Sequence, residues 1–157
     1  MSSVLVLDEF LESQPNRVHK SHRKLARVVR EAYPIGVPAL IMKSSTDRLG
    51  ASAGYSFHLG TPDDILRRIA SWLITNANYN QDVLWSLVRN LWSRHGREDV
   101  ALSALLLANL DHQAAGTDPW DRLSSLMNTK EPADALLLSI EEILRAGHGG
   151  PSKVQYR

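Results

Sequence analysis

Six basic side chains in one short segment are the strongest chemical signal in the sequence. They precede Glu31 without an intervening acid, at Arg17, Lys20, Arg23, Lys24, Arg27 and Arg30. Steps of three and four residues place most of these side chains on one face of a helix. Like charges at this spacing repel by roughly a few tenths of a kcal/mol per pair, and a bound polyanion would relieve that repulsion. The segment therefore predicts contacts with phosphate groups, and a solvated cationic face without a partner is the alternative.

Three more cations could extend such a surface. They are Lys43, Arg67 and Arg68. Trp72 follows Arg68 closely in the sequence, and its ring could stack on a base of the same nucleic acid. Phosphate contacts give affinity and register but little choice of sequence. We therefore expect binding that follows the shape of the nucleic acid and weakens with salt.

Acidic and histidine side chains do not form a recognisable reaction centre. Paired carboxylates occur at 63–64, 98–99 and 141–142. The first two pairs fall in the opening turn of predicted helices, where the helix dipole explains them, and the third is expected to face solvent. The six histidines lack metal-binding spacings such as HExxH, so no metal site and no cofactor are expected. His19 and His22 lie among the cations and are expected to reinforce an anion site at mildly acidic pH.

Helix signals dominate the chain. The basic segment is expected to form one helix from an Asn16 cap to about Tyr33, ended by Pro34. A short helix over 38–50 and a loop over 51–60 follow. Further helix starts are predicted at Thr61-Pro62, Asn80, Asp118-Pro119 and Glu131-Pro132. The segment 97–111 is so rich in leucine that we expect its helix to be buried on most sides.

The spacing of these helices predicts an all-α fold with a repeating design. Starts near 62, 97 and 132 are about 35 residues apart, with others between them near 81 and 119. This is typical of a short α-solenoid of paired antiparallel helices, similar to HEAT repeats; a compact helical bundle is the alternative. Residues 1–147 are expected to form a single all-helical domain, and residues 148–157 a flexible C-terminal tail.

Composition narrows the class of protein. The 157 residues have a net charge of only +1 and include no cysteine, which excludes disulfides and thiolate chemistry. The N-terminal segment meets Asp8 and Glu9 before any basic residue, unlike a signal peptide. No apolar run reaches the roughly 18 residues of a membrane span. We therefore expect a cytoplasmic protein without a membrane partner.

From Tyr33 onward, three segments occur in an order typical of one known family. They read PIGVPALIMK, RNLWSRHGREDVALSALLLANL and DPWDRLSSLMNTKEPADALLLSIEEIL. Their order and leucine-rich helix pairs resemble the HEAT-like repeat family of DNA alkylation repair glycosylases, over about residues 33–146. The resemblance implies a solenoid of helix pairs, contact with DNA and excision of damaged bases.

In that family a tryptophan stands a few residues before a catalytic aspartate. The resemblance implies that Asp134 occupies the position of this aspartate. Lys130 and Glu131 stand in the region of the tryptophan, and Lys130 is one helical turn from Asp134. Because this cation would partly neutralise the carboxylate, we expect no efficient catalysis.

Two classes of function fit the sequence. The first is a helical-repeat module that binds nucleic acid through its basic helix, with a glycosylase-like repair protein as a special case. The second is a protein-interaction scaffold whose basic helix meets an acidic protein surface. Because short solenoids need capped ends, a homodimer is a further expectation.

Overall fold

The computed structural model describes residues 3–38, 55–77, 80–127 and 133–150. These residues form one 3-10 helix and seven α-helices: α1 (Ser3–Glu12), η1 (Asn16–Lys20), α2 (His22–Ala32), α4 (Asp63–Ala77), α5 (Gln81–Arg94), α6 (Arg97–Ala108), α7 (Pro119–Leu126) and α8 (Ala133–Arg145). They contain no strand, so the all-α class is confirmed for this part of the chain. The predicted helix over 38–50, with Lys43, lies outside the described residues.

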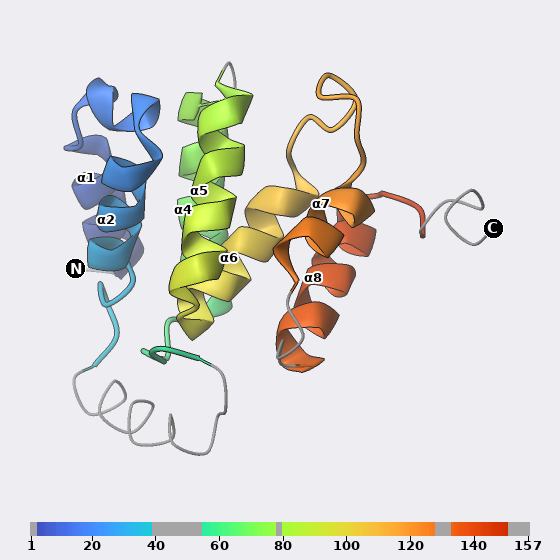
Figure 1. Ribbon diagram of the computed structural model, residues 1–157. Helices are drawn as coiled ribbons and strands as arrows, with labels where there is room; N and C mark the ends of the chain where they lie inside the picture. The colour runs from blue at the N-terminus through green and yellow to red at the C-terminus, as the bar shows by residue number, and fades with distance from the viewer. Residues whose placement is uncertain (1–2, 39–54, 78–79, 128–132, 151–157) are drawn as a thin grey trace.

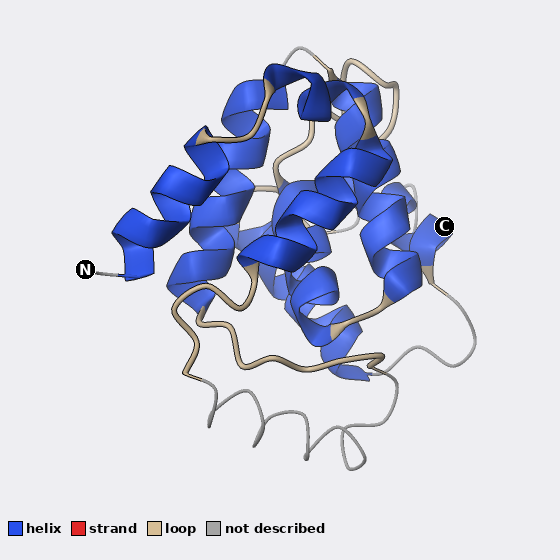
Figure 2. Ribbon diagram, turned by 90° about the vertical axis from the view of Figure 1, so that its left-hand side faces the viewer, coloured by secondary structure: helices blue, strands red, loops and turns tan. Residues whose placement is uncertain are grey.

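The helices follow one another across the molecule in chain order. In Figure 1, α1 and α2 lie at one end, α4 and α5 come next, and α7 and α8 lie at the other end. Figure 2 shows the same helices and their connecting loops turned by 90°. Helix α6 packs against α4, α5, α7 and α8, which makes it the centre of the helical packing.

The burial of α6 confirms the expectation drawn from its leucines. Every residue from Glu98 to Ala108 is buried. Small side chains at Ala101 and Ala104 alternate with leucines along the helix, and residues with little bulk allow neighbouring helices to approach. The helix ends at Ala108, three residues before the predicted end at 111.

The basic segment is divided into two helices, and the prediction of one helix capped by Asn16 was wrong. Residues 16–20 form η1. Ser21 then has an extended backbone (φ −139°, ψ 113°), which interrupts the helix, and its Oγ accepts a hydrogen bond from the backbone N–H of Lys24 at 3.3 Å. Ser21 is therefore the N-cap of α2, because serine supplies the acceptor that the first turn of a helix lacks.

The start of α7 is as the sequence predicts. The Asp118 side chain accepts from the backbone N–H of Asp121 at 2.9 Å, and Pro119 is the first helical residue. At the other end of the described chain, His148 Nε2 lies 2.7 Å from the carbonyl oxygen of Ala108, and Trp120 Nε1 donates to the Gly149 oxygen. The first residues of the expected tail are thus attached to the helices, and residues 151–157 lie outside the described part.

None of the described helices combines the length and apolarity needed to cross a membrane.

Candidate polyanion-binding surface

Helix α2 exposes its charges because its other face is buried. Its buried side chains are all apolar: Leu25, Ala26, Val28, Val29 and Ala32. With these positions packed against the rest of the molecule, the remaining ones face solvent. Arg23, Lys24 and Arg27 occupy them and are exposed.

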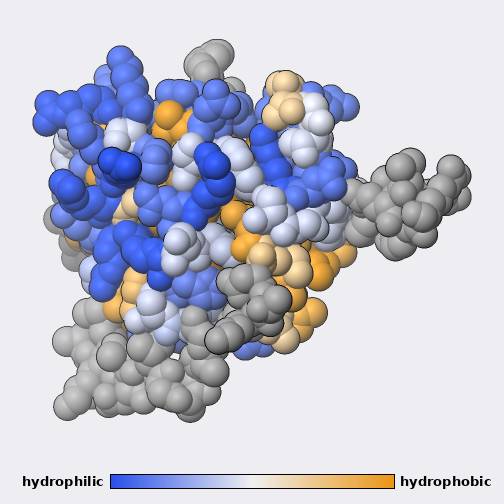
Figure 3. Space-filling model, in the orientation of Figure 1, coloured by the Kyte–Doolittle hydropathy of each residue, from blue (hydrophilic) through white to orange (hydrophobic). Residues whose placement is uncertain are grey.

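The six cations predicted from the sequence form what we call the basic surface: Arg17, Lys20, Arg23, Lys24, Arg27 and Arg30. Arg17 and Lys20 come from η1 and are exposed. Arg30 is half-buried, with its guanidinium carbon 4.5 Å from the centre of the Phe57 ring. Within the described residues, none of the six forms a salt bridge. Figure 3 shows hydrophilic side chains gathered over the α1–α2 end of the molecule.

Two grooves flank α2, and each is lined by three of these cations. The first, of about 280 Å³, is lined by Arg17, Lys24 and Arg27, together with Gln14 and Pro15 of the turn between α1 and η1. The second, of about 490 Å³, lies between α2 and α5 and is lined by Arg23, Ala26, Arg27, Arg30, Glu31, Asn90 and Arg94. Arg27 lines both grooves, so an anion on either side of α2 would lie near its guanidinium.

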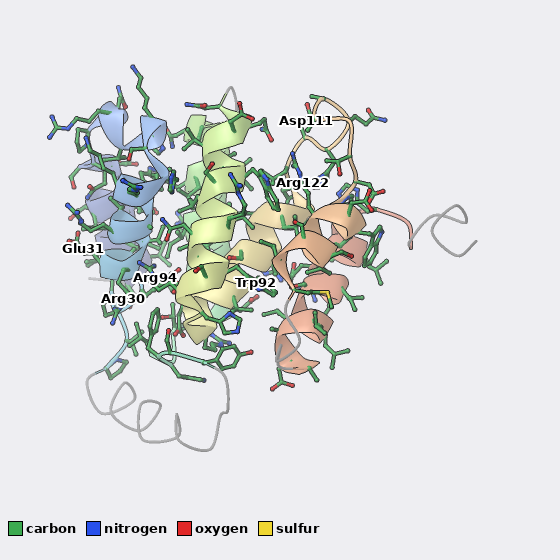
Figure 4. All side chains as sticks on the ribbon, in the orientation of Figure 1. Arg30, Glu31, Trp92, Arg94, Asp111 and Arg122 are labelled. Atoms are coloured by element: carbon green, nitrogen blue, oxygen red, sulfur yellow. The ribbon has the colours of Figure 1, made fainter. Side chains whose placement is uncertain are left out.

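The groove between α2 and α5 is lined in part by Arg94, which forms an ion pair with the buried Asp99. Arg94 donates to both oxygens of Asp99 at 2.8 and 2.7 Å, and to the carbonyl oxygen of Ala26 in α2 at 3.0 Å. The Tyr33 hydroxyl donates to the same carboxylate at 2.9 Å. Burial, and then the charge of Asp99, raise the pKa of Tyr33 well above its usual value. Figure 4 labels Arg30 and Glu31 of α2 and Arg94 of α5 at this end of the molecule.

The neighbouring acid, Glu98, is also fully buried. Its carboxylate accepts the backbone N–H groups of Leu59 at 2.9 Å and of Thr61 at 3.2 Å. The sequence interpretation, which explained the 98–99 pair by the helix dipole alone, was incomplete. Because α6 is buried on all sides, charges in its first turn need partners, and these two carboxylates hold α2, α5 and the segment before α4 in place.

Arg67 and Arg68 are not part of the basic surface. Arg67 donates to Asp63 at 2.7 Å and to Glu142 of α8 at 2.6 Å. Arg68 forms two bonds, of 2.7 and 2.6 Å, with Asp8 of α1, and these hold the pKa of that carboxyl below its usual range. Their charges are balanced by carboxylates of the same chain, so they tie α4 to α8 and to α1.

Of the two histidines in the basic segment, His19 is held inside the fold. His19 is buried, and its ring lies 4.6 Å from that of Trp72. Burial lowers the pKa of His19, which works against the expected extra positive charge at mildly acidic pH. The two rings are tilted by 58° to each other, so His19 lies against Trp72, the residue that the sequence suggested for stacking on a base. Across the described residues, no cluster of three or more His, Asp or Glu side chains could hold a metal ion.

Asp134 lies far along the chain from the basic surface and also apart from it in space. It is exposed in the first turn of α8. A groove between α7 and α8 contains Trp120, Leu136 and Ile140, but Asp134 is not among the residues that line it. The predicted tryptophan region at Lys130 and Glu131 lies outside the described residues.

Comparison with known proteins gives no relative from which a function could be transferred. No protein-family model, no curated protein and no solved structure matches this chain.

Proposed function

With no relative to supply a function, we propose that this chain is a helical-repeat module that binds nucleic acid through the phosphate contacts of the basic surface. The observation that carries the proposal is the set of five exposed cations on η1 and α2, none of which has an ion-pair partner in the described part of the chain. Several arginines outside this surface are instead neutralised by carboxylates of the same chain, as at Arg67, Arg68 and Arg94. Cations left unpaired on one surface suit an external polyanion.

The chemistry of the grooves favours a duplex backbone over single-stranded bases. Neither groove beside α2 is lined by an aromatic side chain. Nonspecific single-strand binding depends on aromatic side chains that stack with the bases. A surface of guanidinium and ammonium groups can instead follow the phosphates of a double helix.

The proposal includes a HEAT-like stacking of helix pairs. Helices α4, α6 and α8 begin at Asp63, Arg97 and Ala133, which are 34 and 36 residues apart. Helix α6 packs against both α4 and α8. Equivalent helices that touch in sequence order are what a stacked repeat requires.

The direct test is a titration of fluorescent duplex DNA, single-stranded DNA and RNA at several salt concentrations. If six phosphates are neutralised, the log–log slope of affinity against salt should be about −5 on duplex DNA. Wild-type binding that ignores salt would contradict the proposal.

A triple variant tests the location of the binding surface. Replacing Arg23, Lys24 and Arg27 with Glu should abolish duplex binding with an unchanged far-ultraviolet circular dichroism spectrum, because all three side chains are exposed. Arg89→Glu is the control, since Arg89 is an exposed arginine of α5 that lines neither groove. Equal affinity of the triple variant and the wild type would rule out α2 as the interface.

An acidic protein surface is the second candidate partner. Glu31 lines both grooves, and a partner with discrete carboxylates could avoid it more easily than a continuous phosphate chain. Competition between duplex DNA and polyglutamate distinguishes the two. Stronger binding of polyglutamate at matched charge would favour the protein partner.

A further inference from the structure

Helix α2 is a ridge between two grooves, and its cations are divided between the two sides of the ridge. On the side of η1, Arg17 and Lys24 line the first groove and not the second. On the side of α5, Arg23 and Arg30 line the second groove and not the first. We call these two sides the flanks of α2. Positive charge on both flanks suits two rows of phosphates, one on each side of the helix, better than a single row.

Arg27 and Glu31 form the crest of the ridge, because each of them lines both grooves. They are four residues apart, so they lie one turn from each other on the same face of the helix, and both are exposed. The salt bridges of the described residues do not include one between them. An arginine that precedes a glutamate by four residues is the less favourable order for such a pair. Both side chains can therefore bind a ligand without first breaking an ion pair with each other.

The carboxylate of Glu31 does not suit a surface that binds phosphates alone. It repels phosphates, and it lies in the last turn of α2, where the helix dipole disfavours a negative charge. A carboxylate at the crest instead suits an uncharged hydrogen-bond donor between the two rows of phosphates. In the major groove of DNA, the amino group of cytosine is the donor that Glu accepts from, and guanine O6 and N7 are the acceptors that Arg binds. The crest therefore matches the edges of G·C base pairs.

The dimensions of a helix favour the major groove of B-form DNA. A helix with its side chains is about 10–12 Å across, and this groove is about 12 Å wide. The major groove of A-form RNA is too deep and narrow for side chains to read. Four residues of a helix rise about 6 Å, and successive base pairs are about 3.4 Å apart. Arg27 and Glu31 would thus reach base pairs about two steps apart.

We propose that α2 enters the major groove of B-form DNA, with its flanks on the phosphates of the two strands and Arg27 and Glu31 at the edges of G·C pairs. The inference rests on the proposed function, because it requires the same cations to bind phosphates. It adds the form of the duplex, the groove that is occupied and the two residues that select the sequence.

Duplexes with altered base edges test the groove. Fluorescence anisotropy compares a G·C-rich DNA duplex with the same duplex carrying 7-deazaguanine, which lacks N7 in the major groove, or inosine, which lacks the guanine amino group in the minor groove. The 7-deazaguanine duplex should bind about fivefold more weakly, the low end of the effect of one bidentate pair, and the inosine duplex should bind as well as the unmodified one. A loss with inosine instead of 7-deazaguanine would place α2 in the minor groove and overturn the inference.

A duplex RNA of the same sequence tests the form of the nucleic acid. It should bind at least about fivefold more weakly than the DNA, because contacts with the base edges are lost in its narrow major groove. Equal affinity for RNA and for both modified DNA duplexes would overturn the inference and leave the proposed function standing. Absence of binding to every duplex would remove both.

Substitution of Glu31 tests the contact with the bases. The wild type should bind a G·C-rich DNA duplex more tightly than an A·T-rich duplex of the same length. Glu31→Gln should reduce this preference about fivefold, mainly by binding the A·T duplex more tightly, since Gln carries no charge and pairs with adenine. Glu12→Gln is the matched control, because Glu12 ends α1, is exposed and lines neither groove. A wild type without the preference, or an equal preference in Glu31→Gln, would overturn the role of the crest.

Substitution of Arg27 separates base contacts from phosphate contacts. Arg27→Lys keeps the positive charge but loses the bidentate geometry, so the preference for the G·C duplex should fall about fivefold. Arg23→Lys makes the same change on a flank and should alter the affinity for the two duplexes equally. If Arg27→Lys also changes both affinities equally, Arg27 binds only phosphate and the inference is wrong.

Discussion

The carboxylate of Asp99 receives hydrogen bonds from several parts of the fold. The donors are the hydroxyl of Tyr33 just after α2, the guanidinium of Arg94 at the end of α5, and the backbone N–H of Gly96 just before α6. Arg94 also binds the Ala26 carbonyl, so the orientation of α2 depends on this one buried acid. The sequence around Asp99 does not predict that Tyr33 binds it, because the two residues are 66 positions apart. The apolar character of α6 does indicate that charges in its first turn must be paired.

Asp99→Ala should lower the free energy of unfolding by about 3–5 kcal/mol, because it leaves the half-buried Arg94 without its counter-ion. Tyr33→Phe should cost only about 1 kcal/mol, since Arg94 and Gly96 still satisfy the carboxylate. Urea denaturation measures both. Equal losses for the two variants would contradict the central role given to the ion pair.

Stability should decrease as the pH falls below about 6.5, the usual pKa of histidine. Burial lowers the pKa of His19, and burial together with the Arg122 charge lowers that of His112. A histidine with a lowered folded pKa binds its proton more readily in the unfolded chain, so its contribution is complete above pH 6.5 and is lost as the pH falls through the folded value. His19→Phe keeps a ring beside Trp72. In this variant the free energy of unfolding, measured by urea denaturation, should decrease less between pH 6.5 and pH 5 than in the wild type. An unchanged pH profile would contradict this assignment.

At the scale of the elements, helix identity was easier to predict from sequence than helix boundaries. The leucine-rich segment of α6 and the Asp118-Pro119 start of α7 carry their signals within a few residues, and both were predicted correctly. The basic segment was harder, since Asn16 and Ser21 are both acceptable caps. The break at Ser21 places Val18 and His19 in the core from η1 while α2 buries Leu25, and this packing requirement is visible only in three dimensions.

Removing the cap tests the corrected boundary. Ser21→Ala should reduce the free energy of unfolding by about 1 kcal/mol, because the N–H of Lys24 loses its acceptor. Asn16→Ala should change it little, since Asn16 is exposed and precedes α2 by a turn of η1. Thermal and urea unfolding of the two variants provide the comparison. A larger effect of Asn16→Ala would restore the single-helix interpretation.

At the scale of the whole molecule, the basic surface and the predicted catalytic residue Asp134 lie at opposite ends. The basic surface lies at the α1–α2 end and α8, which carries Asp134, at the other, with α4, α5 and α6 between them (Figure 1). The six cations could be found from sequence because they are local. The sequence could not predict that Arg67 and Arg68 are bound by carboxylates of the same chain, since their partners Glu142 and Asp8 are 75 and 60 residues away. The exposure of α8 likewise depends on which of its faces α6 covers.

This separation leads to the prediction that the chain does not release alkylated bases from DNA at a useful rate. A glycosylase must hold the phosphates and place a carboxylate beside the same nucleotide, in a site that excludes water. Here the cations are on η1 and α2, whereas Asp134 is exposed on α8 beyond the intervening helices (Figure 1). In contact with water, the attraction between a carboxylate and a developing positive charge falls to about 1 kcal/mol at 4 Å, too little to stabilise a cationic sugar. Incubation with N-methylated duplex DNA, followed by chromatography of the released bases, should give no more free base than a protein-free sample. Release that disappears in Asp134→Asn would show that the carboxylate reaches a nucleotide after all, and that the resemblance to the repair glycosylases extends to their chemistry.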